Sequence, residues 1–175
     1  MQIVVWTLLI TGALSPLRAD EHSADGRIAR AGSTMSFRAS VAVWIPGLNR
    51  VRLFLLAQRP SSAELDSLKE ASQKPWGIHE VLKGKLFTEV EFEFKEPVEK
   101  PGTFTSGNIG WYTVSVYTGK GRPHSTTTSL LAPPKEFKLF KLDLKQELFQ
   151  IQAEGSRWSF RASSDLWVRD SRAIK

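Results

Sequence analysis

Apolar and polar residues alternate with a period of two over much of this chain, which is typical of β-strands with one buried face. The alternating stretches are 34–42, 51–56, 89–94, 112–117, 136–144, 147–153 and 157–163. The last three follow one another with only short turns between them, so they predict a meander of three antiparallel strands. Over the whole chain the pattern predicts about eight or nine strands.

One helix interrupts the strand pattern. Ser61 and Glu64 have the Ser-x-x-Glu spacing of a capping box, in which each side chain accepts a hydrogen bond from the other residue's backbone N–H. Leu65 and Leu68 then share a helix face, and we expect the helix to end before Pro75, because a residue preceding proline avoids helical geometry. Many short strands with one short helix predict an all-β fold, an antiparallel jelly-roll-like β-sandwich.

The pentapeptide Ser-Phe-Arg-Ala-Ser occurs twice, at 36–40 and at 159–163, and a tryptophan follows each copy at the same distance, Trp44 and Trp167. The chain has no room for a second full repeat, so this is not a tandem pair of domains. Each copy as a strand would turn Phe and Ala inward and Ser, Arg and Ser outward. Because domain termini often lie close together, we expect the two strands to be neighbours or to occupy equivalent edges. The alternative is coincidence between two short strands.

The first residues have the pattern of a secretory signal. An apolar run at 3–10 is followed by the small residue Ala19 and then by acidic residues. This predicts a signal peptide over 1–19, a polar, flexible leader over 20–33 and one β-sandwich domain over 34–175. The protein would then be secreted or periplasmic. The alternatives are an apolar first strand or a membrane anchor, but the run is too short for a stable membrane span.

Composition narrows the classes of function. The 175 residues include no cysteine, which excludes disulfides, thiol nucleophiles and Cys-ligated zinc sites. The net charge of +6 favours anionic partners weakly. The basic residues do not form the dense stripe of a nucleic-acid-binding protein, so we expect no nucleic-acid partner.

The arginines of the repeat are the first candidate site. Arg38 and Arg161 are flanked by serines, and the guanidinium fork suits carboxylate, sulfate or phosphate groups. They would form a shallow patch for an acidic glycan or an anionic surface. Other arginines that would add to the patch are Arg50, Arg52, Arg157 and Arg169. The alternative is an ordinary solvated strand face.

Three glutamates on one strand face are a second candidate. Glu89, Glu91 and Glu93 would bind a hard cation such as Ca²⁺ only if loop oxygens joined them. A glycosidase pair needs carboxylates facing each other across a cleft, which one strand does not provide. The alternative, which we favour, is a solvated face with cross-strand basic partners. The partners expected are Lys135, Lys138 and Lys141.

The three histidines, His22, His79 and His124, have no partner at metal-ligand or triad spacing. The sequence therefore predicts no catalytic residue, no metal and no cofactor. A hydrolase with an unrecognised site stays an alternative, because triads assemble from distant positions.

Two tryptophans are candidate binding residues. Trp76 and Trp111 lie in or near expected loops, where an exposed aromatic ring stacks on a sugar or enters a partner's pocket. The alternative for each is packing in the core.

The late strands resemble those of galectin-like sandwiches. The matching residues are Phe137-Lys138-Leu139, Phe149-Gln150-Ile151, Gly155 and Phe160-Arg161, and 32–56 is similar to the family's early strands. The resemblance implies a jelly-roll lectin sandwich. The family's sugar-binding signature, His-x-Asn-Pro-Arg, an Asn and Trp-Gly-x-Glu-x-Arg, is absent, and Trp76-Gly77 with Glu80 is the nearest approach. No binding residue is therefore carried over.

Together these features predict a secreted, non-catalytic binding module for carbohydrate or an anionic extracellular surface. Its candidate ligand-binding residues are Arg38, Arg161, Trp76 and Trp111. One alternative is a protein-interaction or assembly module that pairs through its repeated terminal strands, since a free strand edge is a template for strand addition. The other alternative is the hydrolase.

Overall fold

The described part of the chain is dominated by β-strands. The structure is a computed structural model that describes residues 22–30, 33–100, 102–119, 123–129, 137–154 and 158–169. The expected signal peptide, 1–19, lies outside these residues. Among the described residues, no helix has the length and apolar character needed to cross a membrane.

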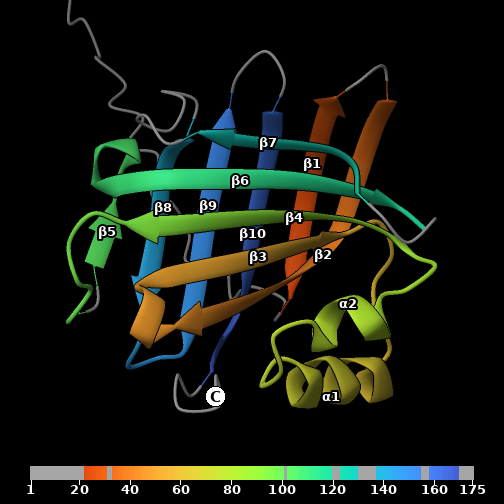
Figure 1. Cartoon of the computed structure of the whole chain (residues 1–175), viewed down its shortest axis with the longest axis horizontal. Helices are drawn as coiled ribbons and strands as arrows, with labels where there is room; N and C mark the ends of the chain where they lie inside the picture. The colour runs from red at the N-terminus through yellow and green to blue at the C-terminus, as the bar shows by residue number, and fades with distance from the viewer. Residues whose placement is uncertain are drawn as a thin grey trace, which may run out of the picture.

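The described residues include ten strands that form one continuous sheet (Figure 1). The strands are β1 (Ser23–Arg30), β2 (Ser33–Ile45), β3 (Arg50–Leu56), β4 (Leu86–Phe94), β5 (Gly102–Phe104), β6 (Ile109–Thr118), β7 (Pro123–Ser129), β8 (Phe137–Asp143), β9 (Leu148–Glu154) and β10 (Trp158–Val168). Their order is β5-β8-β9-β10-β1-β2-β3-β4-β6-β7. The predicted meander is confirmed, since β8, β9 and β10 are successive antiparallel neighbours.

The sheet is curled into a half-barrel. In Figure 1, β3, β4, β6 and β7 cross in front of β8, β9, β10 and β1. The long strand β2 belongs to both halves, because its first part pairs with β1 and its second part with β3. The antiparallel β-rich fold is therefore confirmed, but the described strands form one curled sheet in place of two separate sheets. Alternation along a strand reports a buried face and does not reveal whether the facing layer belongs to the same sheet.

The face that β2 turns to the interior changes near Ser40. Phe37 points into the interior of the half-barrel and so does Trp44, so the inward positions change from odd to even numbers along β2. Buried Ser40 lies at this change, and its hydroxyl reaches the backbone oxygens of Ser23 at 2.9 Å and Ser163 at 3.2 Å. The last serine of the first repeat is thus buried, where alternation predicts an outward position.

The repeated strands enclose β1. Over the pentapeptides, β1 pairs with β10 on one side and with β2 on the other. Beyond β1, the two strands that carry the repeats pair directly in parallel, with Trp167 opposite Val43. Of the two arrangements expected for the repeated strands, the first is confirmed: β2 and β10 are neighbours, and neither lies at an edge of the described sheet.

β1 also corrects the predicted flexible leader over 20–33. Residues 23–30 form a strand in the middle of the sheet, with Ala24 and Ile28 buried. The alternation of this strand is broken by a register shift between Ser23 and Gly26. Pairing with β10 on one side and β2 on the other makes this segment a strand. The composition of the segment alone does not predict these long-range pairings.

Two helices cover part of the outer face of the sheet, at the lower right of Figure 1. They are α1 (Ser62–Ala71) and the unpredicted α2 (Gly77–Val81). Leu68 and Ile78 of these helices pack with Phe54 of β3 in an outer apolar cluster, separate from the interior core. The predicted capping box is confirmed, because the Ser61 hydroxyl accepts from the Glu64 N–H and Glu64 accepts from the Ser61 N–H.

Candidate functional site

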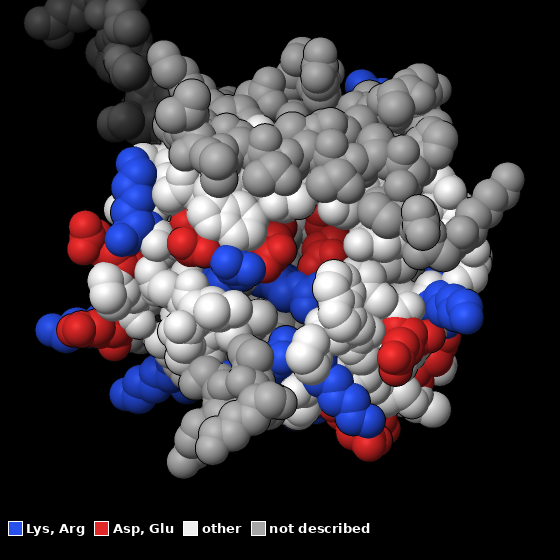
Figure 2. Space-filling view, viewed as in Figure 1, with Lys and Arg blue, Asp and Glu red and all other residues white. Residues whose placement is uncertain are grey.

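A ladder of arginines and glutamates runs along the outer face of β3 and β4. Arg50 donates from Nη1 to Glu91 Oε1 at 2.8 Å and from Nη2 to Glu93 Oε2 at 2.7 Å. Arg52 donates from Nε to Glu89 Oε1 at 2.6 Å. Figure 2 shows basic and acidic side chains in contact at the centre of this face. The antiparallel register puts Arg50 opposite Glu93 and Arg52 opposite Glu91. Arg50 therefore reaches its direct and its diagonal partner, and Arg52 reaches the diagonal Glu89.

This ladder corrects the expected lysine partners of the glutamates. Their partners come from β3, the neighbouring strand, whereas the ammonium of Lys141 lies 3.9 Å from the Asp143 carboxylate. The side chains of Lys135 and Lys138 lie outside the described residues. Arg50 and Arg52 are likewise engaged by glutamates and do not extend a free arginine patch.

Glu89 is the best-connected member of the ladder. It is only 7% exposed, and its second oxygen, Oε2, lies 2.9 Å from Nε2 of His79 in α2. Burial alone would raise the pKa of Glu89, but the hydrogen bond from His79 and the charge of Arg52 outweigh it and lower the pKa. Glu89 is therefore an ionised, buried carboxylate with both oxygens engaged.

His79 joins α2 to this carboxylate and to Tyr117 of β6. Its Nε2 lies 3.1 Å from the Tyr117 hydroxyl, and its Nδ1 lies 3.5 Å from Arg52 Nη2. With a proton on Nε2, the ring donates to the Glu89 carboxylate. Sequence reasoning missed the partners of His79 because they come from three separate elements. The sequence held one indication of these contacts: Glu89 and Tyr117 both lie at the alternate positions of their strands that are expected to face outward.

Tyr117 is held by stacking and by the buried charge. Its ring is parallel to that of Phe87, with centroids 4.3 Å apart. Burial, followed by the negative charge of Glu89, raises its pKa to about 12. The phenol is therefore a neutral hydrogen-bonding group at physiological pH and is poorly suited to act as a base.

Both candidate tryptophans lie beside the ladder. Trp76 is 66% exposed, and its ring centroid is 5.2 Å from that of His79. Trp111 is partly buried, and the Arg50 guanidinium lies 4.4 Å from its ring centroid. Core packing is thus the wrong alternative for Trp76. The two rings mark opposite ends of the network formed by Arg50, Arg52, Glu89, Glu91, Glu93 and His79, which we call the Arg–Glu–His network.

The repeat arginines lie elsewhere on the sheet. Arg38 on β2 and Arg161 on β10 are both exposed, as expected, with β1 between their strands. Asp25 of β1 is the Cα partner of Arg161, so a carboxylate-bearing residue lies between the two arginine strands. Arg169 is buried, and Arg157 lies outside the described residues. The structure therefore separates the arginines that sequence reasoning grouped together.

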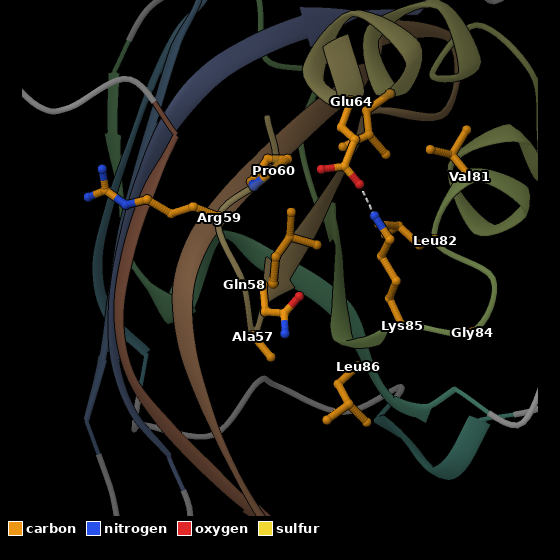
Figure 3. A pocket seen from close by; sticks show the side chains of 12 residues that line it. Ala57, Gln58, Arg59, Pro60, Glu64, Val81, Leu82, Gly84, Lys85 and Leu86 are labelled. Atoms are coloured by element: carbon orange, nitrogen blue, oxygen red, sulfur yellow. Dashed lines mark hydrogen bonds and ion pairs between the residues drawn. The ribbon is translucent and has the colours of Figure 1, made fainter. Parts of the chain in front are cut away.

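A cavity of about 240 Å³ opens beside the helices (Figure 3). Leu56, Leu68 and Leu82 form its apolar part, and the ion pair of Glu64 with Lys85 lies at one side. Within the described ranges, no group of three or more acidic or histidine side chains is arranged to hold a metal ion. The Arg–Glu–His network is therefore a polar surface and this cavity a separate, half-apolar one.

Comparison with known proteins adds no family to this description. No family model matches the chain, and no curated protein or solved structure matches it.

Proposed function

We propose that this protein is a non-catalytic binding module that recognises carbohydrate on the outer face of β3, β4 and β6. The observation that supports this function is the position of Trp76 and Trp111 at the two ends of the Arg–Glu–His network. Sugar rings present apolar faces to aromatic side chains and hydroxyl groups to charged side chains. The network offers both kinds of contact on one surface.

The network is already ordered before any ligand binds. Arg50 contacts two carboxylates, and Glu89 contacts Arg52 and His79, so few side chains would lose freedom on binding. Tyr117 lies six positions after Trp111 on β6, about 20 Å away at roughly 3.3 Å per residue. This length fits an oligosaccharide better than a single sugar. The signal-like residues 1–19 are consistent with a secreted or periplasmic protein that meets such ligands.

The test is binding of the purified protein to an array of neutral and acidic glycans. We expect Trp76→Ala and Trp111→Ala to lower affinity for a bound glycan at least about tenfold each, within the range of an aromatic binding hot spot. Leu86→Ala is the matched control, because Leu86 is also an exposed apolar residue but lines the separate cavity. A blank array with folded protein, or unchanged binding in both tryptophan variants, would contradict the proposal.

A second candidate ligand is an anionic surface bound by Arg38 and Arg161. Both side chains are exposed, and the two strands that carry them flank a single strand. Sulfated glycans that lose binding in Arg38→Ala/Arg161→Ala, but not in the tryptophan variants, would favour this second function. Assembly through the repeated strands has no such support, because β2 and β10 are paired on both sides in the described sheet.

A further inference from the structure

Arg169, directly after β10, carries a buried charge with little compensation. The residue is 3% exposed, and its side-chain Nε has no hydrogen-bond partner among the described residues. Within the part of the chain that the structure describes, the hydrogen bond of Arg169 is the one that its backbone N–H donates to the Trp44 oxygen at 2.8 Å. A buried guanidinium without a hydrogen-bonding anion is strongly unfavourable, so this position calls for a negatively charged partner.

A second guanidinium adds to the positive charge. Burial, and then the nearby charge of Arg52, lower the pKa of Arg169. Arg52 itself is paired with Glu89, and its Nη1 donates to the Pro75 oxygen at 2.9 Å. The close carboxylate, Glu89, is thus engaged by Arg52, and the positive charge of Arg169 has no carboxylate partner among the described residues.

The loop between α1 and α2 borders both arginines. Gln73 Nε2 donates to the oxygen of Val168, the residue before Arg169, at 3.2 Å. Pro75 of the same loop accepts from Arg52. Arg52 and Arg169 thus lie where the exposed loop between α1 and α2 crosses the end of β10.

We propose that Arg169, with Arg52 beside it, binds a small oxyanion, namely a sulfate, phosphate or carboxylate group. The planar guanidinium presents its donors in a fork that matches two oxygens of such a group. Arg52 also belongs to the Arg–Glu–His network, so this site adjoins the proposed carbohydrate surface, whereas Arg169 lies outside that network. Binding of a free oxyanion by Arg169 does not require carbohydrate binding.

The test is thermal unfolding of the full chain at constant ionic strength, with sodium chloride replaced stepwise by sulfate, phosphate or acetate. Wild-type protein should show a saturable rise in Tm, about 3 °C at tenfold excess over Kd, for the anion that fits. Arg169→Met is the main variant, because a long apolar side chain fills a similar space without the charge. It should be at least as stable as wild type in chloride and lose the saturable rise.

Sulfate also stabilises proteins without binding to a site, so only the difference between wild type and Arg169→Met counts. Asp170→Asn serves as a neighbouring control and should keep the wild-type response. Equal responses of wild type and Arg169→Met to all three anions would overturn the proposal. A second result would also overturn it: Asp170→Asn lowers the Tm in chloride, and the Tm of wild type does not change with sulfate, phosphate or acetate. Asp170 would then be the counter-ion of Arg169.

Discussion

Phe37 and Phe160, the phenylalanines of the two Ser-Phe-Arg-Ala-Ser copies, meet edge to face with ring centroids 6.3 Å apart. Gly26 of β1 lies between their strands and is the Cα partner of both residues. Because glycine has no side chain, the two rings meet across the strand that separates them. The two copies of the pentapeptide therefore lie on either side of β1 and place equivalent phenylalanines in contact over Gly26. This contact gives a physical reason why the same residues occur in both strands.

Gly26→Ala should destabilise the protein severely. A Cβ at this position would lie 2.1 Å from the Ser159 oxygen and 2.4 Å from the Phe160 Cα, and the backbone φ of +125° is rarely adopted by other residues. Backbone strain and overpacking together should lower the free energy of unfolding by about 3 kcal/mol or more. Urea denaturation followed by tryptophan fluorescence measures the change.

Gly84→Ala is the control for this substitution. Gly84 also has a positive φ of +85°, but an added Cβ there meets nothing within 4 Å. Only the backbone preference is lost, so we expect a decrease of about 1 kcal/mol. Similar losses for Gly26→Ala and Gly84→Ala would show that the rings and β10 adapt to the extra carbon.

Sequence reasoning located the strands whose alternation is regular and missed those that depend on their neighbours. The half-buried stretches that became β2, β4 and β6 carry period two in their own residues. β1 has a glycine at its centre and a register shift, and β5 has only three residues, so neither has a readable period. Their positions are decided by long-range pairing, which a local pattern does not contain.

The candidate site shows the same division. The place of Trp76 in an expected loop, beside Pro75, made exposure one of two open interpretations, and the structure decides for exposure. The partners of the glutamates did not follow, since they require knowing that β3 lies beside β4. His79 was harder still, because it is positioned by α2, a five-residue helix without a side-chain N-cap. Short helices of this kind are fixed by tertiary contacts and have little sequence signature.

The capping box predicts a measurable loss in Ser61→Ala. The Ser61 hydroxyl accepts a hydrogen bond from the Glu64 N–H, which otherwise has no partner within the helix. Its removal should lower the free energy of unfolding by about 1 kcal/mol. Ser62→Ala, at the first helical residue, is the control and should change stability by less than about 0.5 kcal/mol. Equal effects of the two substitutions would mean that the cap contributes nothing.

Tyr117 should ionise at unusually high pH. Its pKa is raised to about 12, so the folded state holds the phenol proton more tightly than the unfolded state does. The stability from this effect is complete below the unfolded pKa of about 10 and is lost as pH rises toward 12. Subtracting the ultraviolet titration of Tyr117→Phe from that of wild type isolates this tyrosine. A difference midpoint near 10 would contradict the burial of Tyr117 beside Glu89.

Glu89 makes the opposite prediction, for acid. Its folded pKa lies below the ordinary value, so its stabilising effect is complete above the unfolded pKa of about 4.3 and is lost as pH falls through the folded pKa. Glu89→Gln should be less stable than wild type by about 3 kcal/mol at neutral pH, because Arg52 then keeps a buried charge without its carboxylate. This difference in free energy of unfolding should become smaller in acid, because the Glu89 carboxylate of the wild type is then protonated.

Urea denaturation near neutral pH and again below the unfolded pKa tests this convergence. Glu93→Gln is the matched control, since Glu93 also binds an arginine of β3 but its side chain is 34% exposed. A solvated pair of this kind contributes at most about 1 kcal/mol, so Glu93→Gln should alter stability little at either pH. If Glu89→Gln and wild type differ by the same amount in acid and at neutral pH, the destabilisation comes from lost shape and hydrogen bonding. If Glu89→Gln is less stable than wild type at neutral pH and equally stable in acid, while Glu93→Gln resembles wild type at both pH values, the buried charge of Glu89 holds α2 and His79 against the sheet.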